Sequence, residues 1–288
     1  MSRTNVKTKC TVPGRLTIYD ILINAESRIS SISDTPKLDS HLLMSQILTR
    51  PREWLIAHRD DELDSKSIAN FETLLQRRMS GEPIAYITGE RAFWQRDFIV
   101  SPDVLIPRPE TELLVENLLS RLGPGENHVV DLGTGSGAIA ISVAAERPAW
   151  IVTGIDRSPD AINIAKRNAK DLDNVEMKIG NWCDDLMARG IDAIVSNPPY
   201  LREDDPHLPK LRHEPIDALV SGSDGLAAIQ EIIPSAYRCL NTGGLLLIEH
   251  GYNQQESVIE MYKRSLFKRV SGMNDLNNLP RAVVGYRL

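Results

Sequence analysis

The feature that most constrains the fold is an apolar strand pattern that runs directly into a glycine-rich turn and then into an apolar helix. Residues 128–132 have the length and composition of a short buried strand, residues 133–137 follow without a gap, and residues 138–145 have the composition of a buried helix. Glycine at such a turn adopts positive φ and lets the backbone approach a ligand closely. The helix N-terminus beyond it offers free N–H donors. This order predicts a cofactor site at the turn.

The spacing of the glycines distinguishes this turn from a dinucleotide site. The dinucleotide fingerprint is G-x-G-x-x-G, whereas this turn is G-x-G-x-G, with Ala138 following the last glycine. A dinucleotide-dependent dehydrogenase is therefore disfavoured. A second strand pattern ends at Asp156, and an acidic side chain there can bind both hydroxyls of a ribose. Asp156 is alternatively the N-cap of a helix that begins near Pro159, and that role does not exclude ribose binding.

A second motif, Asn197-Pro198-Pro199-Tyr200, follows the apolar run at residues 191–195, which is typical of a buried strand. Asparagine presents a side-chain carbonyl acceptor, the two prolines have fixed φ and no N–H, and tyrosine presents a planar face for stacking. This combination suits one task, which is to hold a flat, weakly nucleophilic NH2 group while an electrophile is delivered to it. Taken alone, the four residues are equally consistent with a strand-ending turn that carries no chemistry.

Composition is that of an ordinary globular enzyme. With 288 residues, of which 42% are hydrophobic and 25% charged, the chain is long enough for one large core and a smaller second unit. Its apolar runs are shorter than the roughly 18–20 residues that span a bilayer, and the N-terminus lacks an apolar signal core. We therefore expect no membrane association.

The cysteines, the histidines and the net charge indicate the cellular compartment, the metal content and the type of partner. The three cysteines are odd in number and scattered, which favours a reducing cytoplasm over a disulfide framework. The six histidines lack metal-ligand spacing, so no metal is expected. The net charge of −6 counts against stable nucleic-acid binding, which usually requires a basic face. It suits a basic protein partner better.

The first part of the chain is predicted as a helical domain over residues 1–84, with residues 1–15 expected to be disordered. Apolar residues recur there at helical spacing, without a strand pattern or a catalytic constellation. Residues 85–108 are predicted as a β-hairpin connector, because alternating runs at 84–89 and 93–100 precede a proline-rich stretch.

The rest of the chain, residues 109–288, alternates strand and helix patterns. This alternation predicts an α/β domain with a mostly parallel sheet and right-handed crossovers. A long polar loop at residues 201–218 interrupts it. Because a loop of this length in a compact domain is usually functional, we predict that it is a substrate lid.

Together these features resemble the S-adenosylmethionine site of Rossmann-like methyltransferases, in which an Asn-Pro-Pro-Tyr motif marks enzymes that methylate exocyclic or amide nitrogen. Over nearly its whole length the chain is similar to the bacterial peptide chain release factor glutamine methyltransferases. The segments that carry this resemblance are residues 81–89, 93–94, 105–112, 131–137, 197–200, 205–208 and 249–251. The tetrad alone is shared with DNA adenine and ribosomal RNA guanine methyltransferases, whereas the segments 81–89 and 105–112 are far more specific.

The resemblance implies a class I methyltransferase fold with a seven-stranded sheet, preceded by the helical domain as a docking surface for the protein substrate. It implies methylation of the glutamine in the Gly-Gly-Gln motif of class I release factors by a cytoplasmic, monomeric enzyme that tunes translation termination. The implied cofactor is S-adenosylmethionine, with S-adenosylhomocysteine as product. The implied cofactor-binding residues are Gly133, Thr134, Gly135, Ser136, Gly137, Asp156, Trp182 and Asn197, and the implied catalytic residues are Asn197, Pro198, Pro199 and Tyr200.

The resemblance also assigns individual roles. Gly133 to Gly137 would wrap the methionine part of the cofactor, Asp156 would take the ribose, and Trp182 would lie along the adenine; the alternative for Trp182 is a core aromatic. The family usually has aspartate beside that tryptophan, where this chain has Asn181, so an acidic contact to the adenine amino group is not carried over.

Two alternatives to a release factor enzyme remain open from the sequence. A nucleic-acid amino methyltransferase acting on adenine or guanine is disfavoured by the missing basic stripe and the absence of a target-recognition domain. A catalytically silent cofactor-binding module is disfavoured by the intact Asn197. We expect Asn197 Oδ1 and the Pro198 carbonyl to accept the two N–H bonds of the substrate amide. Arg108 and Glu110 either line the pocket or form a structural hinge.

Overall fold

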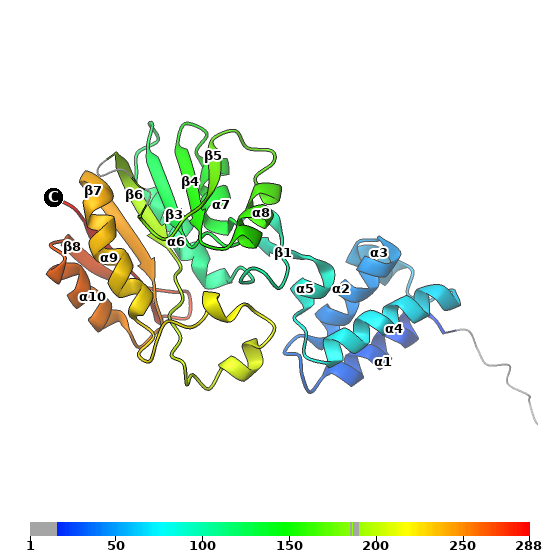
Figure 1. Ribbon diagram of the computed structural model, residues 1–288. Helices are drawn as coiled ribbons and strands as arrows, with labels where there is room; N and C mark the ends of the chain where they lie inside the picture. The colour runs from blue at the N-terminus through cyan, green and yellow to red at the C-terminus, as the bar shows by residue number, and fades with distance from the viewer. Residues whose placement is uncertain (1–15, 185, 187–189) are drawn as a thin grey trace, which may run out of the picture. The chain divides into compact units, whose positions relative to one another are not determined.

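The computed structural model describes residues 16–184, 186 and 190–288 (Figure 1). The described residues up to Thr88 form one compact unit, and those from Gly89 onward form a second. The predicted disorder of residues 1–15 concerns residues outside the described part of the chain. No helix among the described residues is long and apolar enough to cross a bilayer. Cys183 and Cys239 are buried and free, and Cys10 lies outside the described residues.

The first unit is helical. Its helices are α1 (Ile18–Ile29), α2 (Pro36–Leu48), α3 (Arg52–Ala57), α4 (Ser65–Met79) and α5 (Ile84–Thr88). Helix α1 begins at a capping box between Thr17 and Asp20, and Asp64 caps α4 by accepting hydrogen bonds from two backbone N–H groups. Their apolar stripes meet in one core, in which Phe71 and Leu75 are almost completely buried.

The prediction that residues 84–89 form the first arm of a hairpin is wrong. They form helix α5, because Ala85, Tyr86 and Ile87 are buried in succession rather than in alternation, and the Pro83 carbonyl accepts hydrogen bonds from Tyr86 N and Ile87 N. The hairpin lies just beyond, where β1 (Glu90–Phe93) pairs antiparallel with β2 (Arg96–Ile99). Trp94 turns the corner between the two strands with a φ of 54°.

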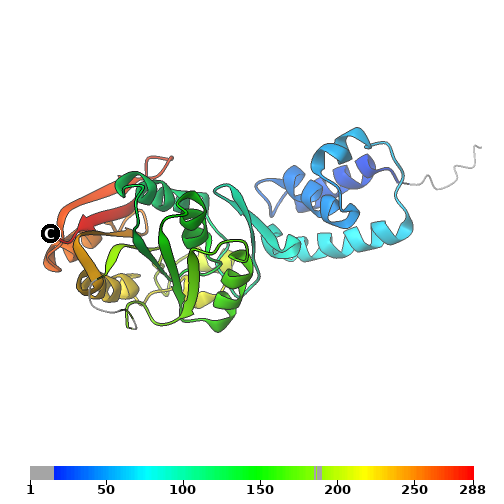
Figure 2. The ribbon, with the colours of Figure 1, turned by 90° about the horizontal axis from the view of Figure 1, so that it is seen from above.

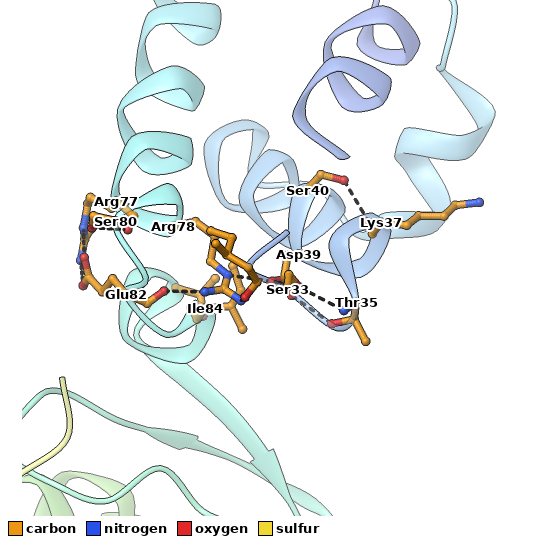
Figure 3. A network of polar contacts seen from close by, with 12 residues as sticks. Ser33, Thr35, Lys37, Asp39, Ser40, Arg77, Arg78, Ser80, Glu82 and Ile84 are labelled. Carbon is orange, nitrogen blue, oxygen red and sulfur yellow. Dashed lines mark hydrogen bonds and ion pairs between the residues drawn. The ribbon is translucent and has the colours of Figure 1, made fainter. Parts of the chain in front are cut away.

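A buried ion pair joins two helices of this unit (Figure 3). Arg78 Nε on α4 donates to Asp39 Oδ2 on α2 at 2.8 Å, and the two side chains are 13% and 4% exposed. Asp39 also accepts hydrogen bonds from the hydroxyls of Ser33 and Thr35. Arg78 Nη1 reaches the Glu82 carbonyl at 3.2 Å, so the same guanidinium fixes the turn that leads into α5.

The second unit is built on a seven-stranded sheet with the order β5-β4-β3-β6-β7-β9-β8. Its strands are β3 (His128–Leu132), β4 (Ile151–Asp156), β5 (Val175–Ile179), β6 (Ile191–Ser196), β7 (Leu240–Glu249), β8 (Lys268–Asn274) and β9 (Pro280–Tyr286). Strand β9 runs antiparallel to both of its neighbours, and the other pairings are parallel. The predicted mostly parallel seven-stranded sheet is confirmed.

Helices cover both faces of this sheet (Figures 1 and 2). They are α6 (Glu112–Arg121), α7 (Ala138–Glu146), α8 (Pro159–Asn168), α9 (Ala227–Cys239) and α10 (Gln255–Arg264), with short 3-10 turns η1 (Pro109–Thr111), η2 (Leu208–Leu211) and η3 (Ile216–Ala218). Successive strand residues point to opposite faces. Val129 therefore packs in the core beneath α6, α7 and α8, whereas Val130 packs in the core beneath α9 and α10.

The strand register places the site. Leu132 at the end of β3 pairs with Ile155 on one side and Ser196 on the other. The residues that come next, Gly133, Asp156 and Asn197, therefore emerge together at the carboxyl edge of the sheet, where open α/β sheets bind their ligands.

We predict that Arg78→Met destabilises the helical unit by about 2–4 kcal/mol, because it leaves the Asp39 carboxylate buried without its cation. Hydrogen exchange of the amides in α1, α2 and α4 measures the change. The matched control is Arg77→Met, which removes a more exposed pair with Glu82 and should cost less than about 1 kcal/mol. Equal effects of the two substitutions would contradict the assigned role of the buried pair.

Candidate active site

The glycine turn carries three positive φ angles, 72° at Gly133, 55° at Gly135 and 85° at Gly137. They have different causes. A Cβ added to Gly135 meets nothing within 4 Å, so this residue faces open space. A Cβ added to Gly137 would lie 2.6 Å from Ile141 Cδ1, so this glycine is packed closely against α7, and its φ of 85° favours glycine in any case.

A cavity of about 430 Å³ lies beside the turn. Six of the predicted site residues line it, namely Gly133, Gly135, Asp156, Trp182, Asn197 and Pro199. The loop at residues 201–218, which we call the lid loop after its predicted role, contributes Pro215, Asp217 and Ala218, and α9 contributes Glu231. The predicted residues Thr134, Ser136, Gly137, Pro198 and Tyr200 are not part of this lining.

Thr134 and Ser136 are buried and hold the turn in shape. The Thr134 hydroxyl donates to Asp131 Oδ2 at 2.6 Å, and the Ser136 carbonyl accepts from Asn168 Nδ2 at 2.9 Å. Asp131 Oδ2 also accepts from Ala140 N, while its Oδ1 has no partner among the described residues. Burial raises the pKa of Asp131 to about 7, against the opposing effect of these hydrogen bonds.

Asp156 and Trp182 form two further walls. Asp156 accepts from Gly135 N and from Ser158 N, both at 2.9 Å, so its carboxylate is fixed at the cavity edge. The N-cap of α8 is Ser158 rather than Asp156, so the alternative role considered for Asp156 is wrong. The Trp182 ring lies over the turn, because a Cβ on Gly133 would be 3.4 Å from its Cζ3. Trp182 also packs at the margin of the core beneath α9, as in the alternative considered for it, and it lines the cavity; its contact with the adenine stays a prediction.

A hydrogen-bond chain connects the tetrad to residues that the sequence did not single out. Asn197 Nδ2 donates to Thr111 Oγ1 at 3.0 Å, and the Thr111 hydroxyl donates to Glu249 Oε2 at 2.8 Å. The Tyr200 hydroxyl donates to the other carboxylate oxygen, Glu249 Oε1, at 3.3 Å. One buried carboxylate thus restrains both polar side chains of the tetrad, and we name these four residues the Glu249 network.

Burial sets the electrostatics of this network. Glu249 is 1% exposed, and burial raises its pKa to about 7; the hydrogen bond from Thr111 and the charge of Arg281 act in the opposite direction. Burial also raises the pKa of Tyr200, so its phenol stays protonated and donates. The signal that could have revealed Glu249 is its position, because it is an acid that directly follows four apolar residues of a buried strand.

Three side chains of the segment 108–112 link neighbouring elements to one another, and one of them belongs to the Glu249 network. Arg108 forms an ion pair with Glu214 of the lid loop, whose side chain is 3% exposed, and Glu214 Oε2 also accepts from Ile106 N at 3.2 Å. Glu112 Oε1 accepts from Trp94 N at 2.7 Å and so ties the hairpin to α6. Thr111 belongs to the Glu249 network. Of the two interpretations left open for Arg108, a structural link fits these contacts, and Arg108 does not line the cavity.

The walls of the cavity fit a nucleoside cofactor. The open space at Gly135 admits a ligand against the backbone, the Asp156 carboxylate can accept hydroxyl hydrogen bonds, and the Trp182 indole offers a flat apolar surface. No group of three histidine, cysteine, aspartate or glutamate side chains among the described residues is arranged to hold a metal ion.

Comparison with known proteins gives a consistent result. The family PrmC N-terminal domain matches residues 20–89, and the family Methyltransferase small domain matches residues 109–273. The release factor glutamine methyltransferase of Coxiella burnetii is 42% identical over 94% of this chain and 99% of its own length. Its namesake from Escherichia coli is 40% identical over 88% of this chain and 93% of its own length. The crystal structure of a methyltransferase from Pyrococcus furiosus is similar with a TM-score of 0.51 and 16% identity, covering 75% of this chain and 98% of that chain.

The likeness to the Pyrococcus furiosus structure, at its low identity, concerns the fold alone. Together with the sheet order and the matched domain, it defines the second unit as a class I methyltransferase fold. At about 40% identity over nearly the full length of its relatives, the chain belongs to the release factor glutamine methyltransferase family. The resemblance inferred from the sequence is thereby confirmed, and the individual site residues stay predictions.

We predict that Glu249 makes stability depend on pH. Because its pKa is raised on folding, its contribution to stability is fully present below about pH 4.5 and is lost as the pH rises toward about 7. Glu249→Gln removes this titration. Urea unfolding gives the free energy of unfolding of both proteins. Between pH 4 and pH 8, the value for the variant should rise relative to that of the wild type by on the order of 2–3 kcal/mol. A difference that is independent of pH would contradict the raised pKa.

We predict that Arg108→Met loosens the lid loop, because it leaves the Glu214 carboxylate buried with one backbone donor. Limited proteolysis should cut residues 201–218 faster, and stability should fall by about 1–3 kcal/mol. The control is Arg202→Met on the same loop, where the paired Asp204 is exposed. Its loop should be cut at the wild-type rate, and identical cleavage of all three proteins would refute the link.

Proposed function

We propose that the protein methylates the side-chain amide nitrogen of the glutamine in the Gly-Gly-Gln motif of class I peptide chain release factors, with S-adenosylmethionine as the methyl donor. Two lines support this proposal. The chain belongs to a family whose curated members carry this activity in their name. The observation that carries it is the arrangement of Asn197, which lines the cavity. Its amide nitrogen is bound to Thr111, and no hydrogen bond among the described residues reaches its Oδ1.

An amide nitrogen is a poor nucleophile because its lone pair is delocalised into the carbonyl group. When bound, S-adenosylmethionine supplies an electrophilic methyl group. The protein's task is then to hold the amide nitrogen in place and to stabilise the positive charge that develops on it. Asn197 Oδ1 and the Pro198 carbonyl accept the two amide N–H bonds, and Tyr200 stacks on the flat carboxamide.

The cofactor-binding residues in this proposal are the ones whose backbone or side chain reaches the cavity. Gly133 and Gly135 admit the ligand against the backbone, Asp156 accepts hydrogen bonds from ribose hydroxyls, and Trp182 packs on the base. Thr134, Ser136 and Gly137 act indirectly, because their contacts keep the turn in its conformation. The helical unit is proposed to dock the release factor. The cytoplasmic location and monomeric state remain predictions.

The proposal is tested by mass spectrometry of a purified class I release factor before and after incubation with the protein and S-adenosylmethionine. The expected result is the gain of one methylene mass on the peptide that contains Gly-Gly-Gln, localised to the glutamine by fragmentation. Methylation of DNA or RNA in a parallel incubation, without any change in the release factor, would favour a nucleic-acid amino methyltransferase instead.

We predict that Asn197→Ala lowers kcat about 10- to 100-fold, because a hydrogen bond to a charging group contributes about 1.5–3 kcal/mol. The Kd for S-adenosylmethionine, measured by calorimetry, should change less than about threefold, since the loss is confined to the transition state. Asn117→Ala on α6 is the control, because among the described residues that side chain bonds to Leu113 and Arg121 of its own helix. A near-wild-type kcat for Asn197→Ala would refute the assignment of Asn197 as a hydrogen-bond acceptor for the substrate amide.

A further inference from the structure

We propose that Thr111 and Glu249 are positioning residues that determine which edge of the Asn197 amide faces the substrate. This inference rests on the proposed function for its kinetic consequence, but its structural content concerns this chain alone. Neither residue belongs to the tetrad or lines the cavity. They come from segments far apart in the sequence, since Thr111 ends the turn η1 and Glu249 ends strand β7.

When Glu249 is ionised, as above its pKa of about 7, the order of donors and acceptors in the Glu249 network allows one arrangement. An ionised carboxylate has no proton to donate, so Glu249 Oε2 must accept from the Thr111 hydroxyl. Once that proton is committed, Thr111 Oγ1 has lone pairs left and must accept from its other neighbour. Asn197 therefore presents its Nδ2 to Thr111, and its Oδ1 is directed away from Thr111.

This orientation decides whether the site can bind an NH2 group. A substrate carboxamide offers two N–H donors to the tetrad and needs carbonyl acceptors there. If the Asn197 amide were turned by 180°, two NH2 groups would face each other and no hydrogen bond would form. The oxygen and nitrogen of an asparagine side chain have nearly the same shape, so packing by itself does not distinguish the two orientations. The hydroxyl of Thr111 does.

Burial of Thr111 and Glu249 strengthens the preference for one orientation of the Asn197 amide. Thr111 is 4% exposed and Glu249 is 1% exposed, so water has little access to replace either partner. Glu249 lies in the ladder between β7 and β9, paired with Ala282, and Pro109 fixes the backbone at the start of η1. The same carboxylate accepts from the Tyr200 hydroxyl, so the ring of the tetrad is restrained from the same point.

The first test does not depend on catalysis. Asparagine-selective 15N labelling of the full-length protein at pH 8, where Glu249 is ionised, gives side-chain NH2 signals, and Asn197→Asp identifies the one from Asn197. We expect slow hydrogen exchange for this NH2 group in the wild type and in Thr111→Ser, which keeps the hydroxyl. In Thr111→Val, which has nearly the same shape without a hydroxyl, exchange should be at least about tenfold faster. Unchanged exchange in Thr111→Val would overturn the proposal.

The second test measures methyl transfer to the release factor. Thr111→Val should lower kcat about 10- to 100-fold with a cofactor Kd within about twofold of the wild type, and Thr111→Ser should recover most of the loss. Thr153→Val is the matched control, because it removes a buried hydroxyl that contacts His128 at the opposite end of β3. It should keep the wild-type kcat.

A double-mutant cycle separates positioning from a general structural effect. If Thr111 acts through Asn197, then adding Thr111→Val to Asn197→Ala should lower kcat no further than Asn197→Ala alone. Additive losses would overturn the proposal. If the wild type transfers no methyl group to the release factor, the proposed function fails, and the exchange rates of the Asn197 NH2 group still decide whether Thr111 fixes its orientation.

Discussion

The arrangement of the site depends on one buried carboxylate. Glu249 lies at the end of a central strand, where it accepts hydrogen bonds from Thr111 and Tyr200, and Thr111 in turn holds Asn197. A carboxylate in such a place is costly to bury, as its raised pKa indicates. The cost is offset because the charge has committed donors on both oxygens and Arg281 nearby. In return, two side chains of the tetrad are fixed by a group that does not itself face the cavity.

The segment 108–112 of the second unit likewise positions several neighbouring elements. Three of its polar side chains contact three different elements. Arg108 binds the lid loop, Thr111 binds the end of β7, and Glu112 binds the turn of the hairpin. Pro107 and Pro109 restrict the backbone here, so these side chains leave a stiff segment at set positions. It is the element against which the tetrad, the lid and the hairpin are all positioned.

Much of the architecture followed from local patterns. The strand, glycine turn and helix at 128–145 and the alternation beyond them led to the correct sheet, because buried parallel strands and amphipathic helices have distinct periodicities. The error at residues 84–89 arose because a six-residue segment is too short for periodicity to distinguish a strand from a helix. There, the Pro83 carbonyl and burial of three consecutive residues decided the outcome. Similarly, the glycines of the turn looked equivalent in the sequence, whereas in the structure Gly135 faces open space and Gly137 is packed against α7.

The sequence by itself determined the fold class, the family, and the two loops that carry the chemistry, because each depends on residues that are neighbours along the chain. Tertiary structure alone decided which of those residues reach the cavity and which donors and acceptors meet. Thr111, Asn197, Glu214 and Glu249 lie up to 138 positions apart, and no spacing rule connects them. The register of β6 and β7 brings Asn197 and Glu249 to one edge of the sheet, and the packing of η1 places Thr111 between them, where the buried carboxylate sets the direction of the hydrogen bonds.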